Sequence, residues 1–230
     1  MKKTTLLALV FGAFLASCSD NGKQVEAGNA EAVETVQTET TVEYKTVKEG
    51  SYLDWRASHL GGAQPRFGKM FANSANVLVN NGQVTNATIV VDMKSLTVEN
   101  FVDDAESTGK LTGHLLSPDL FNTEMYPTSK FELTSIGEGT DGFNSSITGN
   151  LTILGISKSI TFKANITISE EEVSVFSENF SINRADWKMT YNAKGTAGVP
   201  LDYLISDDIE FQIDTFNSRT RNFCYYKNVK

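Results

Sequence analysis

Few side chains in this 230-residue chain are of the types that catalyse reactions or bind metals. There are two histidines, His59 and His114, and two cysteines, Cys18 and Cys224. Neither pair has the HxxxH, HExxH or CxxC spacing that places ligands side by side around a metal ion. The sequence also contains no GxSxG turn, phosphate-binding glycine loop or kinase signature. We therefore expect no metal site, no cofactor and no enzymatic activity.

Arg184 is the side chain best suited to recognise the polar group of a ligand. It follows Phe180 and Ile182 at two-residue spacing, so it would lie at the end of an apolar wall. There its guanidinium could bind a pyrophosphate, a carboxylate or a quinone oxygen. The alternative is a structural ion pair with Asp186 or Asp207, and the sequence leaves both open.

The two histidines have simpler interpretations. His59 shares a strand face with Trp55, so it lies either near a ligand head group or, hydrogen-bonded, at the end of that strand. His114 follows a glycine in a segment with helical spacing and is interpreted as a surface or cap residue.

The first residues have the layout of a secretory signal peptide. Lys2 and Lys3 precede an apolar run that ends at residue 16 and is too short to span a bilayer. The end of this run and the two residues after it, Leu15-Ala16-Ser17-Cys18, resemble the bacterial lipobox, in which a peptidase cuts before a cysteine that is then acylated. We predict removal of residues 1–17 and acyl chains such as palmitate on Cys18. These chains would anchor the protein in the bacterial cell envelope, at the periplasmic face of either membrane or at the cell surface.

The chain is acidic, with a formal net charge of −8, so electrostatics argue against nucleic acid as a partner. Residues 18–45 are mostly small and polar, which predicts a disordered tether with a reach of about 30 Å. Residues 46–216 are expected to form one domain. Residues 217–230 form a basic tail that either folds against the acidic domain or frays. Acylation of Cys18 would leave Cys224 without a partner for an internal disulfide.

Apolar and polar residues alternate with a period of two through most of the domain, which predicts β-strands. The clearest case is a hairpin over 147–168, in which Gly149 is the one gap in the apolar row. An Asn-Gly pair at 81–82 predicts a second hairpin. Phe71 and Val79 are assigned to the inner face of the strand before it. Strands are expected in 52–59, 66–79, 87–93, from 131 onward, 147–153, 160–168, 176–182 and 205–213, and a helical excursion in 97–121.

Eight sequential antiparallel strands leave no unpaired edge if they close into an up-and-down barrel, and an open sandwich is the alternative. The predicted fold class is therefore all-β: an eight-stranded antiparallel barrel with a helical excursion between strands three and four. A barrel of this size is either filled by its own side chains or holds one small ligand.

Three segments resemble motifs of the YceI-like family, in matching order and spacing. Residues 115–136 are similar to that family's "dFF" turn followed by "yPtitF.St.I". Residues 147–158 are similar to "v.G.LTlhGvTk", although Leu154 replaces a histidine. Residues 180–187 are similar to "f.inRsdfGi", although Trp187-Lys188 replaces an aromatic-glycine pair. The resemblance covers about Ser51 to Phe216.

This resemblance implies a periplasmic, lipocalin-like barrel that binds a long isoprenoid lipid, such as a polyprenyl chain or prenyl quinone, in an apolar tunnel. The chain would then be a membrane-anchored carrier of that lipid. The alternative is a structural or partner-binding surface lipoprotein whose barrel is filled by side chains. Ala164 is placed in the path of the ligand. The residues predicted to line the tunnel are Trp55, His59, Phe71, Phe131, Leu133, Leu151, Ile153, Phe162, Ala164, Phe180, Ile182 and Arg184.

Overall fold

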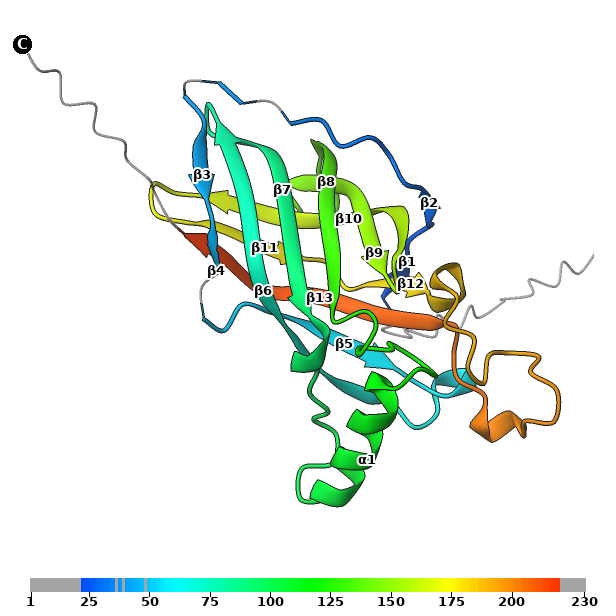
Figure 1. Cartoon of the computed structure of the whole chain (residues 1–230). Coiled ribbons are helices and arrows are strands. Elements are labelled where there is room, and N and C mark those ends of the chain that lie inside the picture. The colour runs from blue at the N-terminus through cyan, green and yellow to red at the C-terminus, as the bar shows by residue number, and fades with distance from the viewer. Residues whose placement is uncertain (1–21, 36, 39, 48, 220–230) are drawn as a thin grey trace, which may run out of the picture.

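Eight strand positions pair in a closed ring in the computed structural model, which describes residues 22–219 except 36, 39 and 48 (Figure 1). The ring closes because its first strand pairs with both the second and the last. β12 (Phe180–Asn183) continues the position of β11 alongside β13. The predicted eight-stranded antiparallel barrel is confirmed, with one position divided in two. The ring order is β5 (Tyr52–Ala57), β6 (Arg66–Asn80), β7 (Gln83–Asp92), β8 (Thr128–Glu138), β9 (Ser145–Ile153), β10 (Ile156–Ile168), β11 (Val173–Ser177) and β13 (Asp208–Arg219).

Two-residue turns close two of the hairpins. Asn81 and Gly82 join β6 to β7 with φ angles of 51° and 76°, and Leu154 and Gly155 join β9 to β10 with 51° and 71°. Positive φ at both central positions is the type I′ geometry, whose twist matches that of the flanking strands. Both hairpins predicted from the sequence are therefore confirmed.

A bulge in β6 reverses which residues face the interior. The register with β7 shifts between Ala72 and Ser74. An extra residue in one strand moves the following side chains to the other face, so Ala72 before the bulge and Val77 after it both line the interior. The prediction that Phe71 points inward is wrong, because uninterrupted alternation was assumed; its neighbours Met70 and Ala72 line the interior instead.

A similar change occurs where β11 gives way to β12. Val173 and Val175 face the interior on β11, and after the break at Glu178 and Asn179 the even-numbered residues of β12 do so. Phe176, which has the parity of β12, is 41% exposed.

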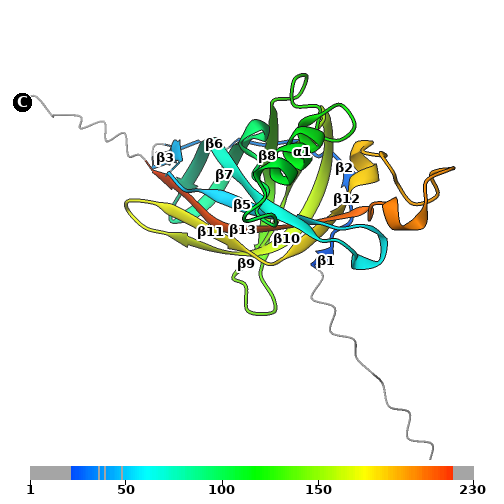
Figure 2. The same cartoon turned by 90° about the horizontal axis from the view of Figure 1, so that it is seen from below.

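One end of the barrel is covered by the excursion between β7 and β8. It comprises η2 (Met93–Ser95), α1 (Ala105–Leu116) and a turn that leads into β8. The Asp104 carboxylate caps α1 by accepting from the N–H of Ser107 at 2.9 Å. Figure 2 shows α1 in front of the strands when the barrel is seen from this end. Together with η1 (Leu60–Gly62), η3 (Arg184–Trp187) and η4 (Leu201–Tyr203), this excursion gives the barrel a covered end, and the β6–β7, β8–β9 and β10–β11 turns form a hairpin end.

The described residues of the predicted tether lie against the barrel and do not form a disordered segment. They form three short strands, a fourth follows at residues 46–47, and their path over the barrel can be followed in blue in Figure 1. Backbone N–H and C=O groups left unpaired at strand edges favour such additions, which composition does not reveal. β1 (Lys23–Gln24) pairs with β12, β2 (Gly28–Asn29) with β10, β3 (Val42–Tyr44) with β6, and β4 (Thr46–Val47) with β13.

The predicted signal peptide, Cys18 and Cys224 lie outside the described residues. β13 continues through Arg219, three residues into the predicted basic tail, and residues 220–230 are not described. Over the described ranges, none of the helices has the length and apolar character needed to cross a bilayer. The same residues contain no group of three or more His, Cys, Asp or Glu side chains arranged to hold a metal ion.

Candidate functional site: an apolar cavity in the barrel

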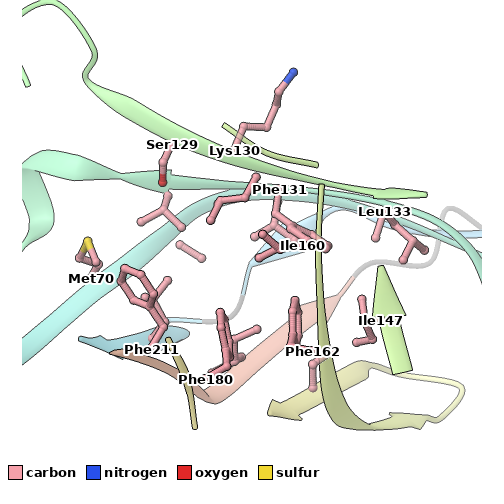
Figure 3. A pocket seen from close by; sticks show the side chains of 18 of the residues that line it. Met70, Ser129, Lys130, Phe131, Leu133, Ile147, Ile160, Phe162, Phe180 and Phe211 are labelled. Atoms are coloured by element: carbon pink, nitrogen blue, oxygen red, sulfur yellow. The ribbon is translucent and has the colours of Figure 1, made fainter. Parts of the chain in front are cut away.

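An apolar cavity runs inside the barrel from the covered end toward the hairpin end (Figure 3). Its volume is ≈ 160 Å³, well above the roughly 10–15 Å³ that one water needs. All eight strand positions contribute to its wall. The lining residues are Tyr52, Leu53, Met70, Ala72, Val77, Val84, Ala87, Ile89, Val91, Met93, Phe121, Ser129, Lys130, Phe131, Leu133, Ile136, Ile147, Leu151, Ile153, Ile160, Phe162, Ile166, Val173, Val175, Phe180, Phe211 and Ile213.

Four phenylalanine rings form a continuous row along this wall. Phe131 packs on Phe162 with centroids 5.7 Å apart, and Phe162 stacks on Phe180 at 4.7 Å with only 9° between the ring planes. Phe180 in turn packs on Phe211 at 6.2 Å. Figure 3 shows the last three side by side. Because the rings come from β8, β10, β12 and β13, they give the cavity a broad apolar surface fixed by four different strands.

Polar groups contribute little to the lining. Lys130 reaches the cavity only through its apolar part, since its ammonium points away in Figure 3 and pairs with Glu132 at 2.9 Å. Ser129 and Tyr52 are the other polar residues among those that line it. A ligand here would be recognised by shape and by burial of apolar surface rather than by charge.

Half of the residues predicted to contact a ligand line the cavity: Phe131, Leu133, Leu151, Ile153, Phe162 and Phe180. Ala164 and Ile182 have the expected inward parity, but each is 0% exposed and lies in the packed core beside the cavity. The path of a ligand along the cavity wall therefore does not include Ala164.

Trp55 and His59 have structural partners at the covered end. The Trp55 indole N–H donates to the carbonyl of Thr97 at 3.0 Å, and its ring lies against Gly68, where a Cβ would come within 1.9 Å of that carbonyl. His59 hydrogen-bonds through Nδ1 to the carbonyl of Asp202. This placement matches the interpretation of His59 as a strand-end residue.

Arg184 is 1% exposed and hydrogen-bonds to main-chain carbonyls around it. Nε donates to Ser206 at 2.9 Å, and Nη1 donates to Met189 at 2.6 Å and to Tyr191 at 3.0 Å. Nη2 donates to Ile205 at 3.3 Å and lies 3.7 Å from the carboxylate of Asp207. Burial lowers the pKa of the guanidinium, and the nearby carboxylate opposes that shift.

Of the two interpretations left open, the structure therefore supports an internal role for Arg184. Its planar group ties η3 to the chain that enters β13. The ion pair is with Asp207, one of the two candidates.

Several lining residues were absent from the predicted site. Met93, Ile160 and Phe211 carry the inward parity of the strands predicted for them, so alternation alone could have included them. Ala72 could not be found in this way, because the bulge in β6 reverses the pattern. Sequence reasoning thus located the wall but not all of its members.

An eight-stranded antiparallel barrel around an apolar cavity is the architecture of small-ligand-binding barrels. The chain belongs to the YceI-like family, since the YceI-like domain matches residues 44–216. β1 and β2 precede the matched region.

Comparisons with individual proteins agree with this assignment. A UPF0312 protein of Pseudomonas putida strain F1 is 31% identical over 166 residues, which cover 71% of this chain and 73% of that protein. A UPF0312 protein of Pseudomonas aeruginosa strain LESB58 is 29% identical over 170 residues, covering 72% and 74%.

Two solved structures share the fold. A polyisoprenoid-binding domain from Saccharophagus degradans superposes with a TM-score of 0.54 at 13% identity, covering 79% of this chain and 99% of that one. Burkholderia cenocepacia BcnA superposes with a TM-score of 0.53 at 15% identity, covering 74% and 96%. At these identities the likeness concerns the fold alone.

Proposed function

We propose that this protein binds a lipid with an isoprenoid chain, such as a polyprenyl lipid or a prenyl quinone, in the barrel cavity. The observation that carries the proposal is the cavity itself, which is long, apolar and lined by every strand position. It also favours this function over that of a surface lipoprotein whose barrel is filled by its own side chains. The name of the Saccharophagus domain, a polyisoprenoid-binding domain of the same fold, supports the choice of ligand.

The apolar wall is sufficient to account for affinity. Burial of a dozen carbons at about 0.8 kcal/mol per CH₂ amounts to on the order of 10 kcal/mol before ordering costs are subtracted. A flexible chain loses rotational freedom on binding, so only part of that free energy remains. Little polar recognition is then required, in keeping with a wall that includes only three polar residues.

The proposed role is binding or transport rather than catalysis. The polar lining residues Tyr52, Ser129 and Lys130 include no pairing of a nucleophile with a histidine or carboxylate base. The Lys130 ammonium, the strongest candidate for chemistry, is engaged with Glu132 outside the cavity.

The proposal includes a lipid anchor on Cys18 in the bacterial cell envelope. It is supported by the lipobox-like sequence that ends at Cys18 and by the short apolar run before it. Gly22, the first described residue, already lies against the barrel, since its carbonyl accepts from the hydroxyl of Ser181 at 3.2 Å. An anchor at Cys18 would therefore keep the barrel close to the membrane surface.

Native mass spectrometry of protein extracted in mild detergent tests the proposed function. We expect bound species with the mass of an isoprenoid lipid, and uptake of added prenyl quinone or prenyl phosphate by delipidated protein. A folded barrel that carries no lipid and takes up neither compound would contradict the proposal.

A further inference from the structure

The barrel wall has a seam where β10 and β12 separate. The last hydrogen bonds between β10 and the β11–β12 strand position are at Glu178, whose N–H donates to the carbonyl of Lys163 at 2.9 Å and whose carboxylate accepts from the N–H of Lys163 at 2.7 Å. Toward the covered end, residues 156–162 of β10 pair with only one other barrel strand, which is β9. β12 likewise pairs with β13 on its other side. The seam is the gap between these two strand edges.

Residues 22–31, which we name the wall segment, fill this seam. β1 runs parallel to β12, and the N–H of Val25 donates to the carbonyl of Ser181 at 2.8 Å. β2 runs antiparallel to β10, with Gly28 opposite Ser159. Val25 is 9% exposed and belongs to the main core cluster. The wall segment therefore completes the barrel wall.

Glu31 fastens the end of the wall segment. Its backbone N–H donates to Asn150 Oδ1 and its carbonyl accepts from Asn150 Nδ2, both at 2.8 Å. Its carboxylate accepts from the hydroxyl of Ser159 at 3.2 Å and from that of Thr134 at 3.0 Å. Asn150 is only 4% exposed beneath this contact. Polar contacts dominate the attachment; Val25 is the one buried residue of the segment, and the partly buried Ala27 packs against the same core.

On the inner side, the seam is bridged by the stack of Phe162 on Phe180. These rings belong to β10 and β12, and both line the cavity. The barrier at the seam thus has two layers, a pair of phenyl rings and a short segment attached mainly by hydrogen bonds. Segments with few buried apolar contacts open locally at lower free energy than the core.

We propose that the wall segment is a removable part of the barrel wall, and that the isoprenoid chain enters and leaves the cavity sideways through the seam. This inference rests on the proposed isoprenoid binding and on the proposed anchor. Three residues separate Cys18 from Gly22, which limits the seam to within about 14 Å of the anchored residue. A chain that passes sideways from the adjacent bilayer into the cavity stays out of water. On the way to a more distant opening, every methylene would be exposed to water.

The other route is end-on, through the hairpin end, where the lining residue Ile136 is 37% exposed. A disulfide across the seam separates the two routes. A Cβ at position 28 would lie 3.7 Å from that of Ser159, within the roughly 3.5–4.5 Å that disulfides span. The Gly28→Cys/Ser159→Cys pair, in a Cys18→Ser/Cys224→Ser background, should therefore fasten the wall segment to β10.

Gly137→Cys/Ser146→Cys is the matched control, because there the corresponding distance is 3.9 Å. That pair joins β8 to β9 near the hairpin end and does not cross the seam. Both proteins are loaded with prenyl quinone while reduced and then oxidised, and transfer of the quinone to phosphatidylcholine vesicles is followed.

We expect oxidation to slow transfer at least about tenfold in the seam pair and to leave the control unchanged, with dithiothreitol restoring the rate. Equal rates in the oxidised and reduced seam pair would overturn the sideways route, as would slowing confined to the control. Failure of every reduced protein to load quinone would overturn both the route and the proposed function. If the seam pair loads quinone but oxidation does not alter its transfer rate, the route alone is overturned.

A second variant tests the route without a disulfide. Asn150→Ala removes the contact that fastens Glu31, and we expect faster transfer. Thr161→Ala is its control, because the Thr161 hydroxyl bonds to Thr148 on the same hairpin and not to the wall segment. Transfer from Asn150→Ala that matches wild type in a folded protein would overturn the proposal.

Discussion

The ring of Phe131 lies directly over Gly149 on the neighbouring strand. A Cβ at position 149 would come within 2.3 Å of Phe131 Cζ and 2.6 Å of the carbonyl of Glu132. The single gap in the apolar row of β9 is therefore occupied by an aromatic ring from β8, which helps to shape the cavity.

Gly149→Ala should destabilise the barrel by about 1–3 kcal/mol, because the added methyl group displaces Phe131 or the backbone of β8. The measurement is the urea midpoint at constant m-value. Gly137→Ala is the control, since the nearest atom to a Cβ there is 3.9 Å away. Equal midpoints for the two variants would contradict the close packing of Phe131 on Gly149.

Ala87→Trp should prevent lipid binding while leaving the barrel folded. Ala87 lines the cavity on β7, and an indole at this position would occupy the space of the ligand at a cost within the roughly 1–3 kcal/mol of overpacking. The neighbouring Thr88→Trp, on the opposite face of the same strand, serves as the control. The measurement is bound-lipid stoichiometry on folded protein, and undiminished lipid in Ala87→Trp would place the ligand elsewhere.

Arg184→Met should cost about 3–5 kcal/mol, because it leaves the buried Oδ1 of Asp207 without its partner and several carbonyls without donors. The observable is the thermal midpoint. Lipid bound per folded molecule should stay at the wild-type level, because Arg184 does not line the cavity. A variant of wild-type stability that loses lipid would instead indicate that Arg184 contacts the ligand.

Cys18→Ser should move the protein from the membrane fraction to the soluble fraction. The fold should be retained, since the described barrel begins four residues later. Fractionation followed by a high-salt wash checks this result. Variant protein that stays fully membrane-bound after the wash would rule out acylation of Cys18 as the anchor.

Strand positions and the barrel could be predicted because alternation is a local property, and in β8 through β10 it continues with little interruption. Phe131, Leu151 and Phe162 were therefore assigned correctly to the cavity wall. Phe71 was not, because the bulge in β6 depends on how two strands pair, and it reverses the inward parity partway along the strand.

Residues 22–31 and Arg184 illustrate a second limit. The wall segment is held mainly by backbone hydrogen bonds and by one buried valine, so its composition resembles that of a disordered tether. For Arg184, the deciding partners are carbonyls, which every residue possesses. Contacts of this kind depend on three-dimensional placement and cannot be identified from residue types.

The position of the wall segment also bears on the order of folding. Gly22 contacts Ser181, 159 positions further along the chain, and pairings this distant in sequence form slowly because a long loop must close first. During synthesis the amino-terminal residues emerge first, yet they can dock only after both of their partner strands exist. We therefore expect the residues that are synthesised first to dock last and complete the barrel. An amino-terminal truncation would remove the segment that forms in this last folding step.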